Sequence, residues 1–269
     1  MQRFYAPYEH ATFSYLKGGR GEQILLCLHG FGEEADTFSF LEHRLGDAFT
    51  IYAIDFPWHG QTKWEKSLTF PVKGMIQLLQ TIIADFEHQK MHLLCYSMGG
   101  RVGLSLLERI PNQIQKAVFL APDGLKLNFW YWLATQTWPG NGLFKVTMEN
   151  PKWFAWLVDA MKRFGWINMS VAKFVHAYID NKQMRDDLYR IWTTMRKFRP
   201  QLQRVKQNII RHQIPVWMLF GEFDRVIVAA SGYKFQNGLN ELVQVDVLKS
   251  GHQLLREKHA EAIVTAIIK

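Results

Sequence analysis

Short apolar segments of strand length alternate with segments of helical period along most of the chain, and this alternation restricts the fold more than any other feature. The strand-like segments are residues 23–28, 49–55, 91–96, 118–121, 216–220 and 242–248. Such alternation is typical of a parallel sheet covered by helices. Residues 2–17 predict an additional antiparallel pair. We therefore predict an α/β fold with a mostly parallel central sheet of about eight strands, flanked by helices.

Residues 124–200 interrupt this alternation. They contain seven of the ten tryptophans and no β-branched run that resembles a core strand. We expect a set of helices inserted between the strand that ends near Leu120 and the strand that begins near Ile214. The predicted organisation is therefore a core formed by residues 1–123 and 201–269, with residues 124–200 as an inserted α-helical lid.

The net charge of +8 is concentrated in the same insertion. Twelve Lys or Arg and five Asp or Glu lie between Gly124 and Pro200, so this segment contributes 12 − 5 = +7. A basic patch favours a nucleic-acid partner, but the chain has no recognisable nucleic-acid-binding module and the segment is rich in aromatic residues. We expect no nucleic-acid partner. The basic side chains are predicted to form a solvated outer face, and they include Arg163, Arg185, Arg190, Arg196 and Arg199.

The composition favours a cytoplasmic protein with a large core. Hydrophobic residues make up 48% of the chain, yet no apolar run approaches the roughly 20 residues that cross a bilayer. The first fifteen residues lack the apolar region of a secretory signal. Cys27 and Cys95 lie inside strand-like runs, and we expect both to be buried reduced thiols. No feature of the sequence indicates an oligomeric state.

The segment CYSMGGR, residues 95–101, joins the strand MHLLCY to a helix that begins with Met98-Gly99-Gly100. A sharp strand-to-helix turn holds a serine above the sheet, and the helix behind it offers free N–H groups. Small neighbours are needed for such a turn, and Cys95 is larger than the glycine more usual there. Ser97 is thus a candidate nucleophile. The alternative interpretation is that Ser97 only caps the helix, as serines often do.

Three further segments favour the nucleophile. LHGFG (28–32), FGEFD (220–224) and SGH (250–252) each follow a predicted strand. Open α/β sheets place their sites at the carboxyl ends of the strands. An N–H of the first segment, expected to be that of Phe31, would pair with the Met98 N–H to bind an oxyanion. The other two segments bring Asp224 and His252 to the same edge, in the order serine, acid, histidine.

With these motifs the chain resembles the α/β-hydrolase superfamily over nearly its full length. DFPWHG (55–60) is similar to the family's turn after the next strand, except that Trp58 stands where glycine is more common. The resemblance implies that Ser97 is the nucleophile, His252 the base and Asp224 the partner that orients it. It also implies that the backbone N–H groups of Phe31 and Met98 form the oxyanion hole.

Other polar residues at the predicted edge have simpler interpretations. His29 is expected to brace its loop, Asp55 to fix the proline turn that follows it, and Asp123 to begin the insertion rather than to replace Asp224. The candidate substrate pocket comprises His29, Gly30, Trp58, Trp130 and Trp153. No metal-binding motif and no GxGxxG after the first strand are present. We therefore expect neither a catalytic metal nor another cofactor.

The helical spacing of Trp153, Trp156, Leu157 and Phe164 is interpreted mainly as packing of one helix face onto the core. A pocket beneath such a segment would have an apolar wall. We expect a small-molecule substrate with an apolar moiety, and an anionic group on it if a basic side chain faces inward.

Three functions are compatible with these residues. The leading hypothesis is a serine hydrolase of small carboxylic esters or related acyl compounds, acting through an acyl-enzyme. The second is C–C bond hydrolysis, or elimination of pyruvate from an anionic substrate, because YSMGGR with a basic lid is similar to the menaquinone-pathway synthase and to meta-cleavage-product hydrolases. The third is a non-catalytic ligand-binding protein that retains the fold.

Overall fold

The computed structural model describes residues 1–65, 69–126, 129–165, 169 and 179–269. The chain divides into two compact units. The core unit comprises Met1–Lys126 and Lys197–Lys269, and the helical unit comprises Leu127–Arg196.

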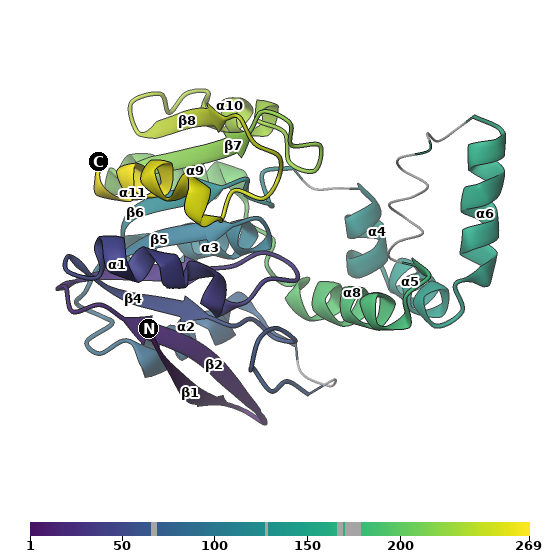
Figure 1. The fold of residues 1–269 in the computed structure, drawn as a ribbon, viewed down its shortest axis with the longest axis horizontal. Helices are drawn as coiled ribbons and strands as arrows, with labels where there is room; N and C mark the ends of the chain where they lie inside the picture. Colours follow the sequence, from purple (N-terminus) through teal and green to yellow (C-terminus); the bar gives the residue numbers. More distant parts are fainter. Residues whose placement is uncertain (66–68, 127–128, 166–168, 170–178) are drawn as a thin grey trace. The chain divides into compact units, whose positions relative to one another are not determined.

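The core unit is built on an eight-stranded sheet with the order β1-β2-β4-β3-β5-β6-β7-β8 (Figure 1). β1 pairs with β2 and β2 with β4 in antiparallel fashion, and all other neighbours are parallel. The strands are β1 (Gln2–Tyr8), β2 (Ala11–Gly18), β3 (Gln23–Leu28), β4 (Phe49–Ile54), β5 (Met91–Tyr96), β6 (Ile114–Leu120), β7 (Val216–Gly221) and β8 (Val243–Leu248). The predicted mostly parallel sheet of about eight strands is confirmed.

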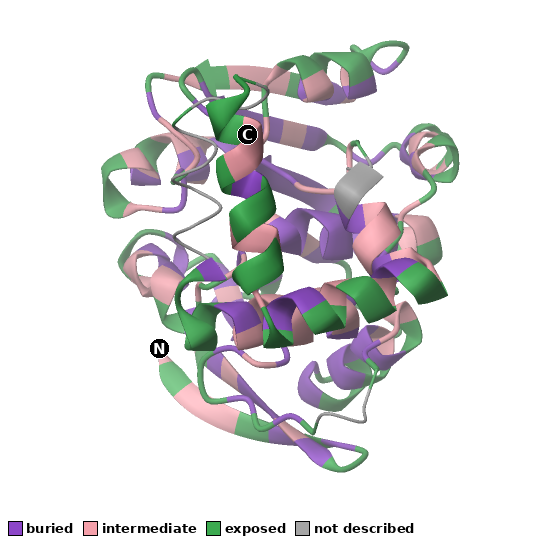
Figure 2. Ribbon diagram, turned by 90° about the vertical axis from the view of Figure 1, so that its right-hand side faces the viewer, coloured by how far each residue is buried: buried purple, intermediate pink, exposed green. Residues whose placement is uncertain are grey.

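Helices cover both faces of this sheet. One face carries α2, α3 and α9, and the other carries α1 and α11 (Figure 1). Their bounds are α1 (Glu42–Leu45), α2 (Val72–Ile82), α3 (Met98–Arg109), α9 (Leu202–His212) and α11 (Ala260–Ile268), and α10 (Ala230–Gln236) packs beside β8. Because they are covered on both sides, the central strands are almost entirely apolar and buried (Figure 2).

The parallel register determines where polar side chains can meet. β3, β5, β6, β7 and β8 run in the same direction, so their carboxyl ends reach one edge of the sheet. Residues that follow these strands by one to four positions are therefore brought together, although they are far apart in the sequence. Within the described ranges, no helix combines the length and apolarity needed to cross a bilayer.

The described part of the helical unit consists of α4 (Phe129–Gln136), α5 (Trp138–Glu149), α6 (Lys152–Arg163) and α8 (Lys182–Met195). Aromatic rings pack α4, α5 and α8 together: the ring centroid of Trp192 lies 5.0 Å from that of Tyr131 and 5.6 Å from that of Phe144. Thr137 caps α5, because its hydroxyl accepts a hydrogen bond from the Gly140 N–H at 3.0 Å. The role of residues 124–200 as a lid remains a prediction.

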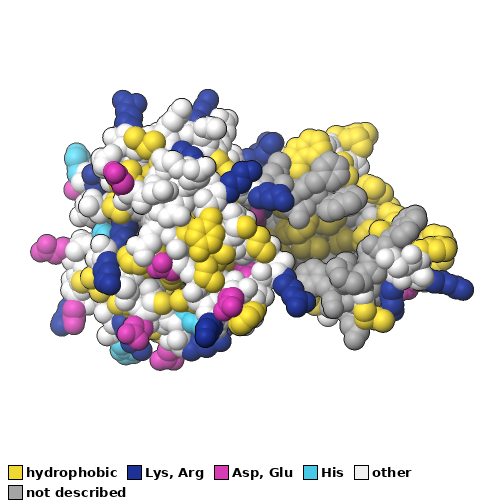
Figure 3. Space-filling view, turned by 90° about the horizontal axis from the view of Figure 1, so that it is seen from above, with side chains coloured by type: hydrophobic (Ala, Val, Ile, Leu, Met, Phe, Trp, Pro, Cys, Tyr) yellow, Lys and Arg dark blue, Asp and Glu magenta, His cyan; other side chains and the backbone are white. Residues whose placement is uncertain are grey.

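One feature of this unit differs from the expectations. Arg185 is buried, not solvated: it donates hydrogen bonds to the carbonyl oxygens of Met148 (2.9 Å) and Ile179. The two carbonyl oxygens belong to buried residues and need a hydrogen-bond donor from the protein in place of water. The Arg185 guanidinium supplies this donor, which explains why a charged side chain is buried here. Within the helical unit, α6 buries Val158, and packing of its Trp156 and Phe164 face onto the core remains a prediction. Figure 3 shows hydrophobic side chains on the surface of this unit, with Lys and Arg beside them.

We predict that Arg185→Met loosens the helical unit, since two buried carbonyl groups would lose their donor at a cost of about 1–3 kcal/mol. Hydrogen exchange of the amides in α5 and α8 should accelerate. Arg163→Met, at an exposed position of α6, is the matched control and should leave exchange unchanged. Equal exchange in both variants would contradict a bracing role for Arg185.

Candidate active site

Ser97 lies in a strained turn between β5 and α3. Its φ of 47° and ψ of −113° are conformations that non-glycine residues rarely adopt, at a cost of about 1–3 kcal/mol. The turn is held by its backbone: the Ser97 N–H donates to the carbonyl of Leu120 (3.0 Å), and its carbonyl accepts from the N–H groups of Gly100 and Asp123 (both 2.8 Å). Among the described residues the hydroxyl makes no capping hydrogen bond to α3. The hydroxyl is thus available to other groups.

Three polar side chains from separate loops form one chain of hydrogen bonds. Ser97 Oγ lies 3.0 Å from Nε2 of His252, and Nδ1 of His252 lies 2.7 Å from Oδ2 of Asp224. The Asp224 side chain is fully buried, whereas that of His252 is 24% exposed. An ionised carboxylate only accepts hydrogen bonds, so Nδ1 carries a proton and Nε2 is free to accept the Ser97 proton.

The environment of Asp224 favours its ionised form. Burial, the largest influence, would raise its pKa, but hydrogen bonds from His252 and from the N–H groups of Ile227 and Val226 outweigh it and lower the pKa. The two amides donate to Oδ1 at 3.0 Å and 2.7 Å. The carboxylate is therefore fixed on one side by backbone and offers its other oxygen to His252.

The backbone N–H groups of Phe31 and Met98 have no acceptor among the described residues. Met98 directly follows Ser97, and Phe31 directly follows Gly30, which approaches Ser97. The segments that contain these two N–H groups approach each other closely at Gly30 and Gly99. A Cβ added at Gly30 would lie 3.1 Å from Cβ of Ser97, and one added at Gly99 would lie 2.1 Å from the carbonyl oxygen of Leu28. Only glycine permits the second contact, so the sequence GG at the start of α3 brings the two segments together.

His29 braces the loop that carries Phe31. The Phe56 N–H donates to Nε2 of His29 (3.1 Å), so the proton is on Nδ1, which donates to the carbonyl of Gly30 (2.7 Å). Burial, and then the neighbouring His59, lower the pKa of His29 well below its usual value. His29 is fully buried and neutral, which fits a brace better than a base.

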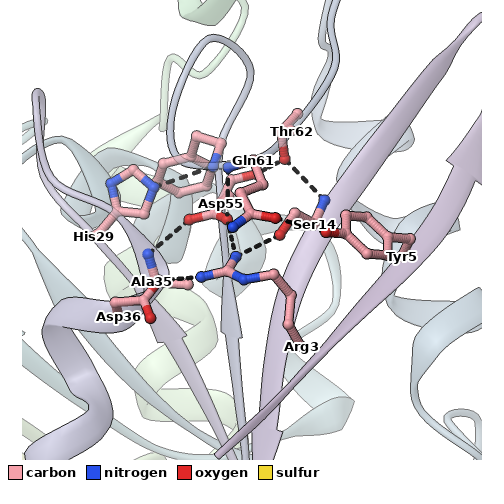
Figure 4. Close-up of polar contacts among 10 residues, drawn as sticks. Arg3, Tyr5, Ser14, His29, Ala35, Asp36, Asp55, Gln61 and Thr62 are labelled. Carbon is pink, nitrogen blue, oxygen red and sulfur yellow. Dashed lines mark hydrogen bonds and ion pairs between the residues drawn. The ribbon is translucent and has the colours of Figure 1, made fainter.

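Asp55 organises the neighbouring turn, as Figure 4 shows. Its buried carboxylate accepts hydrogen bonds from Arg3 (2.7 Å) and from the backbone N–H groups of Ala35 (2.7 Å) and Gln61 (3.2 Å). These donors belong to β1, to the 3-10 helix that begins at Ala35, and to the turn itself. Asp55 therefore fixes the turn after β4 and has no part in the hydrogen-bond chain of Ser97.

Asp123 is engaged elsewhere as well. Its carboxylate forms an ion pair with Arg101 of α3, and its N–H bonds to the carbonyl of Ser97. His252 contacts Asp224, not Asp123. The structure thus separates the two acids that the sequence left as alternatives.

Two contacts beside the site involve residues to which the sequence patterns assigned no role. The Tyr96 hydroxyl donates to the carbonyl of His252 (3.2 Å), and Arg256 forms a two-bond ion pair with Glu33. Glu33 and Arg256 are 223 positions apart, so a single sequence carries no signal for their pairing.

Residues 19–259 match the family described as serine aminopeptidase, S33. The chain belongs to this family of α/β-hydrolases. Among curated relatives, it is 31% identical over 104 residues to the uncharacterized hydrolase YugF of Bacillus subtilis (strain 168), covering 39% of this chain and 38% of that protein. It is 26% identical over 122 residues to the pimeloyl-[acyl-carrier protein] methyl ester esterase of Proteus mirabilis (strain HI4320), covering 45% and 42%.

The chain thus spans less than half the length of these two relatives. The structural similarity to a solved protein covers a larger share of the chain than these sequence matches do. A probable hydrolytic enzyme from Pseudomonas aeruginosa PAO1 superposes with a TM-score of 0.68 at 14% identity, over 100% of this chain and 94% of that one.

The two departures from the α/β-hydrolase motifs have structural explanations. Cys95 fits because residue 103 of α3 is glycine: a Cβ there would lie 2.4 Å from Sγ of Cys95. Trp58 has a φ of 67°, in the left-handed region that favours glycine, which explains why its family position is usually glycine. The tryptophan maintains this conformation at a cost in backbone strain.

The remaining pocket candidates have different surroundings. Trp153 of α6 is 41% exposed, and the Trp130 side chain lies outside the described residues. Gly30 lies against Tyr96 and Ser97, whereas the His29 ring is fully buried beside the rings of Phe56 and His59. A pocket role for these residues and for Trp58 remains a prediction.

The lowered pKa of Asp224 has a consequence for stability. A carboxyl group whose folded-state pKa is below its unfolded value stabilises the fold above the unfolded pKa and loses that effect as pH falls through the folded pKa. We predict that the difference in free energy of unfolding between the native chain and Asp224→Asn shrinks as the pH falls below about 4. Denaturant unfolding at several pH values below about 5 measures it, and a difference that grows as the pH falls through this range would contradict the assignment.

Proposed function

We propose that this α/β-hydrolase is a serine hydrolase that cleaves a small carboxylic ester or related acyl compound through Ser97, His252 and Asp224. The observation that carries the proposal is the continuous hydrogen-bond chain from Ser97 Oγ through His252 to Asp224, with heavy-atom distances of 3.0 Å and 2.7 Å. A serine hydroxyl is a poor nucleophile unless a base contacts it and a third group orients that base.

In the proposed mechanism, Nε2 of His252 accepts the Ser97 proton while Oγ attacks the carbonyl carbon. Asp224 keeps the imidazole in the tautomer with its proton on Nδ1, and its ionised form stabilises the imidazolium that develops. His252 then donates the proton to the leaving group. Water, deprotonated by the same imidazole, hydrolyses the acyl-enzyme and restores the Ser97 hydroxyl.

The N–H groups of Phe31 and Met98 are proposed to bind the oxyanion of the tetrahedral intermediate. Both lack an acceptor among the described residues and belong to segments that approach each other at Gly30 and Gly99. The Met98 amide also lies at the N-terminus of α3, where the helix dipole favours negative charge. One such donor is worth about 3–4 kcal/mol in comparable sites.

For the substrate we propose an ester with an apolar acyl or alcohol moiety, and for residues 124–200 the role of a lid. The partial likeness to a methyl ester esterase supports ester cleavage, and the aromatic content of the insertion supports an apolar substrate. The buried free thiols of Cys27 and Cys95 agree with a reducing, cytoplasmic environment, which we also propose.

We predict that a fluorophosphonate probe labels the native chain and that Ser97→Ala abolishes the labelling. The reason is that the probe reacts only with a serine whose hydroxyl is activated by a base. In-gel fluorescence measures the label, and Ser105→Ala, which removes a hydroxyl bonded inside α3, serves as the control. Absence of label in the native chain would favour a non-catalytic ligand-binding protein.

We predict that Asp224→Asn lowers kcat for a p-nitrophenyl ester by about 10⁴-fold, because the amide stabilises the wrong histidine tautomer. Asp123→Asn should change kcat by less than about tenfold, since Asp123 pairs with Arg101. Steady-state kinetics on both variants separates the two acids. Equal losses, or the reverse order, would move the orienting role to Asp123.

A substrate panel tests the bond that is cleaved. Ester turnover that exceeds turnover of anionic C–C substrates supports the proposal. Labelling of Ser97 combined with turnover of the anionic C–C substrates alone would reassign the same residues to C–C cleavage or pyruvate elimination.

A further inference from the structure

Tyr96 lies between the two loops that must stay in register for the proposed reaction. It is the last residue of β5, directly before Ser97, and its side chain is buried. Its hydroxyl donates to the carbonyl of His252 (3.2 Å), and the two rings lie 5.6 Å apart between centroids. A Cβ added at Gly30 would lie 3.0 Å from two carbons of the tyrosine ring. The ring thus separates the loop of Gly30 from the loop of His252.

An ion pair joins the same two loops. Arg256 donates from its two terminal nitrogens to the two carboxylate oxygens of Glu33, at 3.2 Å and 3.0 Å. The Glu33 N–H donates to the carbonyl of Gly30 (3.3 Å), which closes the turn that contains Phe31. The Thr37 hydroxyl also donates to Glu33, at 3.0 Å. One end of the ion pair is therefore fixed to the turn of the Phe31 amide.

The other end is fixed to His252. The Arg256 N–H donates to the carbonyl of Leu254, and the Leu254 N–H donates to the carbonyl of His252, both at 2.9 Å. The His252 carbonyl thus accepts from Leu254 and from Tyr96. Two independent contacts therefore hold segment 252–256. One is the hydrogen bond from Tyr96 of β5, and the other is the ion pair with Glu33 of the Phe31 loop.

Burial keeps the Tyr96 hydroxyl protonated, so that it remains a donor. Burial chiefly, with Glu33 and Asp224 adding to it and Arg256 opposing it, raises the pKa of Tyr96 to about 12. The phenol remains protonated throughout the range in which a neutral histidine acts as a base.

We propose that Tyr96, Glu33 and Arg256 are positioning residues that hold the His252 imidazole in register with Ser97 and with the Phe31 amide. Tyr96 sets the distance between the two loops, and the ion pair prevents their separation. The inference rests on the proposed function, because it assigns these residues to the geometry of that reaction. A purely stabilising role fits the ion pair poorly, since the Arg256 side chain is 38% exposed and such pairs add little to the free energy of unfolding.

The first test is Tyr96→Phe, which keeps the ring and removes the hydroxyl. Misplacement of a catalytic group by about 1 Å costs up to about 100-fold in rate. We expect kcat for a p-nitrophenyl ester to fall about 10- to 100-fold, with KM changed less than about threefold and an unaltered thermal midpoint. Tyr5→Phe, which removes an exposed hydroxyl bonded to Gln61, is the control and should behave like the native chain. A kcat equal to that of the native chain would overturn the role of Tyr96.

The second test is a double-mutant cycle on the ion pair. Glu33→Gln and Arg256→Gln should each lower kcat about tenfold, and the double variant should be no slower than either single variant, because both changes break one contact. The exchanged pair Glu33→Arg with Arg256→Glu should recover part of the loss. The equivalent cycle on Arg20 and Asp47, an exposed ion pair before β3 and β4, should leave kcat unchanged. Additive losses, or a loss of thermal stability with no change in kcat, would overturn the role of the ion pair.

Fluorophosphonate labelling of the native chain separates the two proposals. If the native chain is labelled at Ser97 and the variants react at the native rate, only the positioning role is wrong. If the native chain is not labelled, the serine hydrolase assignment fails, and the positioning role fails with it.

Discussion

The close approach of α3 to the end of β3 is the contact on which the site depends. The Gly99 N–H donates to the carbonyl of His29 at 2.9 Å, and a Cβ at this glycine would lie only 2.1 Å from the Leu28 carbonyl oxygen. This contact places the Met98 and Phe31 amides in adjacent segments, on either side of the Ser97 turn. Any side chain at position 99 would push the helix away and separate the amides from each other.

In the described ranges, three of the six non-glycine residues with a positive φ lie at the edge where the strands end. Trp58, Ser97 and Ala121 follow β4, β5 and β6, and they have φ values of 67°, 47° and 40°. The sheet behind them is buried on both faces and leaves these turns no room to relax. A strained turn that does not relax holds its side chain in one direction, which is what a preorganised nucleophile requires.

The sequence predicts the fold and the positions of the main site residues because both depend on local patterns. Apolar runs indicate the strands, and Ser97, Asp224 and His252 each follow a run within four residues. Parallel pairing then brings their loops to one edge. Fold alone does not predict contacts between side chains on different loops: the pairing of Glu33 with Arg256 and the burial of Arg185 against two carbonyl groups depend on three-dimensional packing.

One departure from the family motifs, Cys95, could have been explained from the sequence. The larger Cys95 is accommodated by Gly103, eight residues later on the helix that packs against it, and a compensating small residue is visible in the sequence. The partner of the apolar face of α6 is a different case, because amphipathic spacing shows that one face is apolar but does not identify what covers it.

The central claim is that the Ser97 hydroxyl attacks a carbonyl carbon and carries an acyl group during turnover. Mass spectrometry of peptides, after rapid acid quenching of the chain with a p-nitrophenyl ester, tests it directly. We predict an added acyl mass on the peptide that contains Ser97, appearing within one turnover and disappearing as substrate is consumed. Turnover with the acyl group on another residue, or with no acylated peptide under single-turnover conditions, would contradict it.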